Sequence, residues 1–114
     1  MKVTRFEDII AWQKSKELAT NIYTLFSESK DFSFRDQIQR AAVSIMNNIS
    51  EGFERKSNNE FKQFLYIAKG SCSEVRSMLI LALELKKITK DEYTKQHTLA
   101  EEISKMLSGF IKTL

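Results

Sequence analysis

One helix-start signal occurs four times in this sequence, at intervals of about one helix. Each copy pairs a Ser or Thr with an Asp or Glu three residues later, and the copies begin at Thr4, Ser33, Ser57 and Thr89. The hydroxyl of such a pair accepts a hydrogen bond from the first helical turn, while the carboxylate lies at the positive end of the helix dipole. Because an apolar stripe at helical spacing follows each copy, the chain is predicted to form four helices.

The composition excludes the fold classes that depend on tight turns. The 114 residues include no proline and three glycines, whereas β-rich folds use both residue types at their turns. A hydrophobic content of 42% mixed with 29% charge is typical of helix bundles and suffices for one modest core. We therefore predict an all-α, antiparallel four-helix bundle, a single domain over residues 1–114 with helices at about 5–28, 34–52, 58–87 and 90–112.

The third predicted helix carries the most regular apolar stripe. Residues there alternate spacings of four and three, which is the pattern of helices that pack at a shallow angle. Gly70 lies at the centre, where glycine costs about 1 kcal/mol relative to alanine, so we expect another backbone to approach closely. A neighbouring row is expected to widen the buried face. The main row consists of Phe61, Leu65, Ala68, Cys72, Val75, Leu79 and Ala82, and the neighbouring row of Phe64, Ile67, Ser71, Met78, Leu81 and Leu85.

The second predicted helix is unusual in its polar side. A solvated face usually carries Lys and Glu, but here short hydrogen-bonding side chains recur at helical spacing with one Arg and one Glu. We interpret this side as a packing or subunit-contact surface rather than a catalytic one, because no nucleophile–base pair accompanies it. The predicted assembly face comprises Gln37, Arg40, Ser44, Asn48 and Glu51, together with Trp12, Gly70 and Ser71.

The charge of the chain permits a nucleic-acid partner without requiring one. The 18 basic and 15 acidic residues give a net charge of +3, and the two signs are interspersed. A basic excess suits phosphate backbones, although simple solvation is the alternative reading of each basic side chain. The candidate nucleic-acid-binding residues are Arg35, Arg55, Lys56, Lys62, Lys69, Arg76, Lys86 and Lys87.

No constellation of residues indicates an enzyme, a metal site or a cofactor. His97 is the only histidine, and Thr94 stands where the Glu-x-x-His pair of a di-iron bundle needs a Glu. Cys72 falls in the apolar row of the third helix, which favours a buried small side chain over a reactive thiol. The Gly70–Ser71 pair lacks the strand and the lysine of a phosphate-binding loop. We predict a non-enzymatic protein without cofactors.

The cysteine count and the N-terminal residues favour the cytoplasm. A single cysteine allows no intramolecular disulfide, and the acidic pair Glu7–Asp8 stands where the apolar part of a signal peptide would begin. No apolar run approaches the roughly 18 residues of a membrane span. We predict a soluble, cytoplasmic protein without a membrane partner.

Motifs in the first three predicted helices resemble one known family. Phe6 and Trp12 lie in the first helix, and residues 37–52 read Gln-Ile-x-Arg-Ala-Ala-x-Ser-Ile-x-x-Asn-Ile-x-Glu-Gly. The third helix carries Ser-x-x-Glu-Phe from Ser57 and Ile-Ala-x-Gly-Ser-x-x-Glu from Ile67. In order and spacing, these motifs resemble the 23S ribosomal RNA intervening-sequence proteins, four-helix bundles related to the accessory variability determinant of diversity-generating retroelements. The resemblance implies a left-handed up-down-up-down bundle that assembles into a ring, typically a homopentamer, with a basic surface in relatives that bind nucleic acid or a reverse transcriptase.

The residues leave two functions open. The first is a homo-oligomeric bundle that binds RNA or DNA through a basic surface, by charge and shape rather than by base reading. The alternative is an oligomeric adaptor for a polymerase, a reverse transcriptase or a ribosomal factor, without direct nucleic-acid binding.

Overall fold

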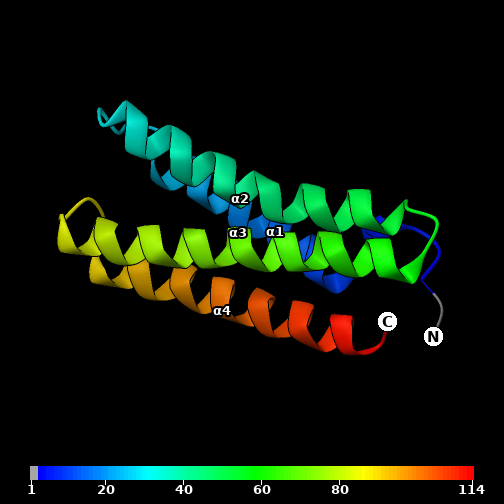
Figure 1. Cartoon of the computed structure of the whole chain (residues 1–114). Helices are drawn as coiled ribbons and strands as arrows, with labels where there is room; N and C mark the ends of the chain where they lie inside the picture. The colour runs from blue at the N-terminus through cyan, green and yellow to red at the C-terminus, as the bar shows by residue number, and fades with distance from the viewer. Residues whose placement is uncertain (1–2) are drawn as a thin grey trace.

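Four α-helices form the computed structural model, which describes residues 3–114 (Figure 1). They are α1 (Ile10–Leu25), α2 (Phe32–Phe53), α3 (Asn58–Glu84) and α4 (Lys90–Lys112), and a short 3-10 turn, Phe6–Asp8, precedes them. Residues 3–114 contain no strand. The predicted all-α four-helix bundle is therefore confirmed.

Cross-helix contacts give the direction of the neighbouring helices. Ser44 of α2 lies 2.9 Å from Ser71 of α3, hydroxyl to hydroxyl, and the Gln37 amide donates to the Glu74 carboxylate at 3.3 Å. Lower numbers on α2 thus meet higher numbers on α3, so the two helices run antiparallel (Figure 1). The left-handed arrangement of the bundle stays a prediction.

The core follows the main apolar row of α3. All seven of its members are buried, as predicted. The neighbouring row is only partly buried, because Ile67, Leu81 and Leu85 each leave about half of their surface in solvent. The physical reason is that α3 packs against α2 and α4 but not against α1, so only a narrow stripe of α3 is covered. The prediction that this second row widens the buried face is wrong for these three residues.

Two of the predicted helix starts are confirmed. The Thr89 hydroxyl accepts from the Glu92 N–H at 3.1 Å, and the Glu92 carboxylate accepts from the Thr89 N–H at 2.9 Å, which closes a full capping box. Ser57 likewise accepts from the Glu60 N–H at 3.2 Å. These side chains satisfy backbone donors that the first turns of α4 and α3 would otherwise leave free.

The first predicted start, at Thr4, is wrong. Ile9 adopts an extended conformation (φ −76°, ψ 120°), so α1 begins at Ile10 rather than near residue 5. The bend buries Ile9 and lets the Phe6 ring pack edge-on against Trp12, with 5.2 Å between ring centroids. Hydrophobic burial thus overrides a local capping signal. The C-terminal end of α1 also differs from the prediction, because α1 ends at Leu25 rather than near residue 28.

The second predicted start, at Ser33, is also wrong, because Asp31 caps α2 instead. Its carboxylate accepts from the Phe34 N–H at 3.2 Å and lies 3.0 Å from Lys87 Nζ. The hydrogen bond from Lys87, followed by that from the Phe34 backbone, lowers the pKa of Asp31. A carboxyl group with a depressed folded-state pKa stabilises the fold above its unfolded pKa, and this contribution is lost as the pH falls through the folded pKa.

The close approach of helices occurs at Gly52 rather than at Gly70. A Cβ atom on Gly52 would lie 2.6 Å from the Phe64 Cβ and 2.9 Å from the Phe61 Cδ1, whereas a Cβ on Gly70 would meet nothing within 4 Å. Gly70 lies on the solvent side of α3, away from α2 and α4. The expected backbone contact at Gly70 is therefore absent within residues 3–114.

Lys86 offers a direct way to stabilise the bundle. Helix α3 ends at Glu84 rather than near residue 87, and Lys86 follows with φ 59°, in the left-handed region. This position is one that glycine adopts without steric cost. Lys86→Gly is expected to raise the free energy of unfolding by about 0.5–1 kcal/mol in urea titrations. Lys86→Ala is the matched control, because it removes the charge but keeps the Cβ. An equal gain from alanine would mean that charge, not backbone strain, limits stability here.

None of the helices described, over residues 3–114, is both long enough and apolar enough to cross a membrane.

Candidate nucleic-acid interface and polar surface of α2

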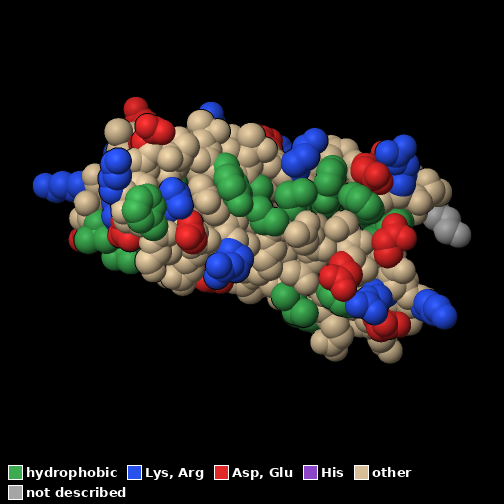
Figure 2. All heavy atoms as spheres, turned by 90° about the horizontal axis from the view of Figure 1, so that it is seen from above, with side chains coloured by type: hydrophobic (Ala, Val, Ile, Leu, Met, Phe, Trp, Pro, Cys, Tyr) green, Lys and Arg blue, Asp and Glu red, His purple; other side chains and the backbone are tan. Residues whose placement is uncertain are grey.

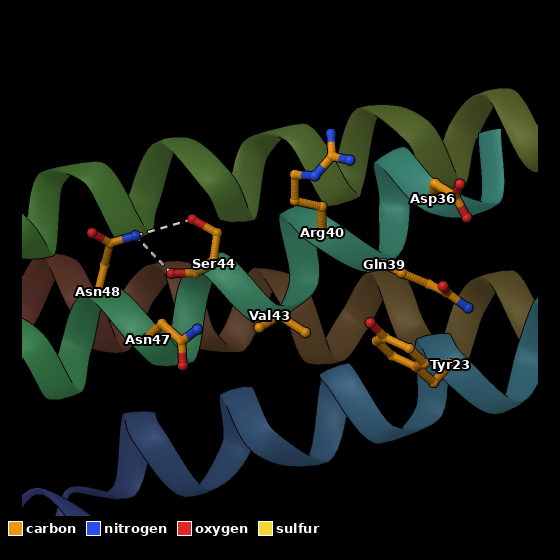
Figure 3. Close-up of a pocket in the computed structure, with 8 residues that line it drawn as sticks. All are labelled: Tyr23, Asp36, Gln39, Arg40, Val43, Ser44, Asn47 and Asn48. Carbon is orange, nitrogen blue, oxygen red and sulfur yellow. Dashed lines mark hydrogen bonds between the residues drawn. The ribbon is translucent and has the colours of Figure 1, made fainter. Parts of the chain in front are cut away.

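Three residues of the predicted assembly face form a hydrogen-bond network inside the bundle. Ser44 contacts Ser71 across the α2–α3 boundary at 2.9 Å. The Asn48 amide donates to the Ser44 carbonyl at 2.8 Å and to the Ser44 hydroxyl at 3.0 Å (Figure 3). The network satisfies partly buried polar groups and fixes the register of α2 on α3. Ser44, Asn48 and Ser71 therefore have a structural role within one chain.

The other members of the predicted assembly face are more dispersed. Gln37 reaches Glu74, and Glu51 forms an ion pair with Arg55 at 2.9 Å, one turn away on α2. Arg40 is exposed and makes no ion pair within residues 3–114. The remaining two members lie apart from the row, since Trp12 packs against Phe6 on the α1 side and Gly70 is exposed on α3.

An open hollow of about 520 Å³ lies along the outer side of α2. Short side chains on α2 leave this space, and one tyrosine of α1 borders it (Figure 3). It contains no nucleophile–base pair, and no group of three metal-ligating side chains occurs in residues 3–114. Its lining consists of Tyr23, Asp36, Gln39, Arg40, Val43, Ser44, Asn47 and Asn48. The hollow is therefore a depression lined mainly by polar side chains of α2.

Three of the candidate nucleic-acid-binding residues have carboxylate partners within the bundle. These contacts, all at 2.9–3.1 Å, join Arg35 to Asp36, Arg55 to Glu51 and Lys87 to Asp31. Each of the three cations also lies over a phenylalanine ring. Engaged cations contribute less to an external anion, so we remove these three from the candidate interface. Lys56 and Lys86 are exposed but lie beyond opposite ends of α3, Lys56 before its start and Lys86 after its end.

The remaining three candidates form a row along α3. Lys62, Lys69 and Arg76 recur every seven residues, which places them on one side of the helix. All three are partly buried, and none makes an ion pair within residues 3–114. The Nε of Arg76 is buried and has no hydrogen-bond partner in the same part of the chain. Because the protein covers this nitrogen, only the remainder of the Arg76 guanidinium can reach an external acceptor.

The packing of α3 on α4 adds two lysines that the sequence did not single out. The Cys72 thiol donates to the Ala100 carbonyl at 3.0 Å, which sets the antiparallel register of the two helices. The burial predicted for Cys72 is confirmed. Burial also raises the pKa of that thiol to about 11, so Cys72 is a neutral donor at physiological pH. In this register Lys105 and Lys112 lie along the bundle axis within about one helical turn of the levels of Lys69 and Lys62. We call these five residues the α3–α4 strip: Lys62, Lys69, Arg76, Lys105 and Lys112.

No carboxylate forms an ion pair with a member of the α3–α4 strip within residues 3–114. Two nearby carboxylates contact other residues, since Glu101 lies 3.6 Å from His97 Nδ1 and Glu74 accepts a hydrogen bond from Gln37. Figure 2 shows another face of the molecule, seen from above relative to Figure 1. On that face both basic and acidic side chains surround a band of hydrophobic side chains. The five members of the α3–α4 strip, by contrast, are all basic and none of them makes an ion pair within residues 3–114.

Comparisons with known proteins agree with this architecture. The chain matches a family model described as 23S rRNA-intervening sequence protein over residues 7–109. It is also similar to a crystal structure of a protein with unknown function from the S23 ribosomal protein family of Bacteroides thetaiotaomicron, with 32% identity and a TM-score of 0.85. That similarity covers 90% of this chain and 98% of the other. No curated protein matches the chain. Since the family match includes all four helices almost completely, the chain belongs to the 23S rRNA-intervening sequence protein family.

Proposed function

We propose that this protein is a non-enzymatic, homo-oligomeric helical bundle that binds nucleic acid through the α3–α4 strip. The observation that carries the proposal is the row of Lys62, Lys69 and Arg76, which lacks carboxylate partners within residues 3–114 and lies level with two lysines of α4. Such cations are complementary to a phosphate backbone, which carries a regular series of negative charges.

Binding of this kind is governed by charge and shape. The strip offers ammonium and guanidinium donors, which position a backbone but do not read base edges. With about five phosphate contacts, the logarithm of the affinity is expected to fall with the logarithm of the salt concentration with a slope of about −3 to −5. The bundle itself supplies a rigid support, because its core fixes α3 against α4.

Self-association is the second part of the proposal. Apart from Tyr66, helix α3 and its C-cap residue leave four large aliphatic side chains about half exposed, and a second copy of the chain could cover them. They are Ile67, Ile80, Leu81 and Leu85. The hollow on α2 and exposed Arg40 provide a polar surface that a neighbouring copy can also cover. The resemblance described above implies a pentameric ring, which would repeat the α3–α4 strip around an axis, and a cytoplasmic setting suits such an assembly.

The proposal is tested by fluorescence anisotropy with labelled RNA at increasing salt and by light scattering on the same sample. We expect affinity that decreases steeply with salt and a mass several times the 13.3 kDa of one chain. Absence of binding at low salt, or binding that salt does not weaken, would contradict the nucleic-acid role. A mass of one chain would contradict the assembly.

The adaptor function is the alternative, and the exposed apolar residues of α3 favour it specifically. A polymerase, reverse transcriptase or ribosomal factor would bury these residues without needing the positive charge of the α3–α4 strip. Recovery of one such protein with the bundle after nuclease treatment, together with no affinity for RNA or DNA, would support the adaptor over the nucleic-acid binder.

A further inference from the structure

Tyr66 is an exposed aromatic side chain beside the α3–α4 strip. Its exposed fraction is 56%, and it lies four residues after Lys62 and three residues before Lys69, so all three share one side of α3. The strip therefore has an aromatic surface between two of its cations.

The ring of Tyr66 is uncovered even though lysines flank it in the sequence. Five other aromatic rings in residues 3–114 have a cation above them, whereas Tyr66 has neither a cation nor an aromatic partner in that range. The five pairs are Lys16 with Trp12, Arg35 with Phe32, Arg55 with Phe64, Lys87 with Phe34 and Lys90 with Tyr93. Internal packing thus does not account for this tyrosine.

Gly70 keeps the neighbourhood of Tyr66 open. Helical side chains lean toward the N-terminus, so a side chain at position 70 would lie over the surface of residue 66. Glycine at this position disfavours the helix by about 1 kcal/mol, yet a Cβ here would meet no atom within 4 Å, and the φ of Gly70 is not positive. Neither packing nor backbone conformation therefore requires a glycine. The absence of a side chain leaves one approach to the Tyr66 ring free.

We propose that Tyr66 is a stacking platform for an unpaired base, and that the nucleic acid bound by the α3–α4 strip is single-stranded. This inference rests on the proposed nucleic-acid function and specifies its ligand. Proteins that bind single strands combine a basic track along the backbone with aromatic rings on which bases stack. In a duplex the bases are already stacked on each other, so a ring on the convex side of a helix gains no such contact.

The test compares two labelled RNAs of equal phosphate number, an unstructured single strand of uridines and a blunt duplex, by fluorescence anisotropy with the full chain. Tyr66→Leu keeps the apolar bulk but removes the π surface, and it is expected to weaken single-strand binding about tenfold while duplex binding stays unchanged. Tyr66→Phe is expected to retain the affinity. Tyr23→Leu is the matched control, because Tyr23 is similarly exposed but lies on α1 beside the hollow.

A second variant, at Gly70, tests whether the absence of a side chain there keeps the Tyr66 ring accessible. Gly70→Gln is expected to lower single-strand affinity about as much as Tyr66→Leu, since its side chain covers the ring while glutamine favours the helix. Unchanged single-strand affinity in both variants, with binding still sensitive to salt, would overturn this inference and leave the nucleic-acid role intact. A fall in the mass of the Tyr66→Leu protein by light scattering would assign the ring to a contact between copies and overturn it as well. No binding of either RNA by the wild type would reject both proposals.

Discussion

Gly52→Val is expected to lower the free energy of unfolding by about 3 kcal/mol, measured by urea denaturation. The Cβ of any larger residue at this position would lie 2.6 Å from the Phe64 Cβ. Because that atom is attached directly to the backbone of α3, rotation of a side chain cannot relieve the overlap. Helices α2 and α3 would have to separate locally.

The same substitution would also disturb the aromatic cluster at this end of the bundle. Phe61, whose Cδ1 would lie 2.9 Å from the new Cβ, packs edge-on against Phe53 and Phe110 at centroid distances of 5.9 and 5.2 Å. Separation of α2 from α3 would therefore loosen contacts with α4 as well. Steric overlap here outweighs the gain of up to about 1 kcal/mol that replacing a helical glycine ordinarily brings.

Gly70→Ala is the matched control for this prediction. Gly70 is also helical, but nothing lies within 4 Å of its Cβ position, so alanine is expected to stabilise the chain by about 0.5–1 kcal/mol. If Gly52→Val were tolerated, the close packing at Gly52 would be contradicted. Destabilisation by Gly70→Ala that depends on protein concentration would instead show that Gly70 lies at a contact between copies.

Reversing the charge of three residues in the α3–α4 strip is expected to reduce nucleic-acid affinity by about 100-fold or more. The variant replaces Lys62, Lys69 and Arg76 by Glu. Each substitution removes a cation that lacks a carboxylate partner within residues 3–114 and adds an anion that repels phosphate. Anisotropy titrations at a fixed low salt concentration measure the loss, and circular dichroism checks that the helices remain.

The control variant makes the same change in net charge elsewhere. Lys30, Lys86 and Lys95 are all exposed and lie outside the α3–α4 strip, so their replacement by Glu is expected to weaken binding far less. An equal loss in both variants would mean that overall charge, rather than the strip, attracts nucleic acid. The proposed interface would then be wrong even though the protein binds.

Local signals predicted the helices well where nothing distant competed with them. The Thr89 capping box is confirmed because a cap depends only on residues close in sequence. The main row of α3 is confirmed because an apolar stripe is buried by whichever helices pack against it. The starts at Thr4 and Ser33 failed because contacts from elsewhere decided them, namely burial of Ile9 and the pairing of Asp31 with a residue 56 positions away.

The candidate interface was predictable only in part for the same reason. The seven-residue spacing of Lys62, Lys69 and Arg76 is visible in the sequence. Their relation to Lys105 and Lys112 depends on the register that the Cys72–Ala100 contact sets, and periodicity of one helix carries no information about its register on another. The exposure of Tyr66 likewise depends on which helices cover α3.

The two ends of the bundle are closed by different chemistry, and they should therefore respond to different solvents. At one end, the Asp31–Lys87 ion pair joins the turn between α1 and α2 to the turn between α3 and α4. At the other, three phenylalanine rings join α2, α3 and α4. Acid or high salt weakens an ion pair but leaves aromatic packing nearly unaffected. Amide exchange in acid should consequently begin at the Asp31 end. The two ends of the bundle would then open at different rates in the same solvent.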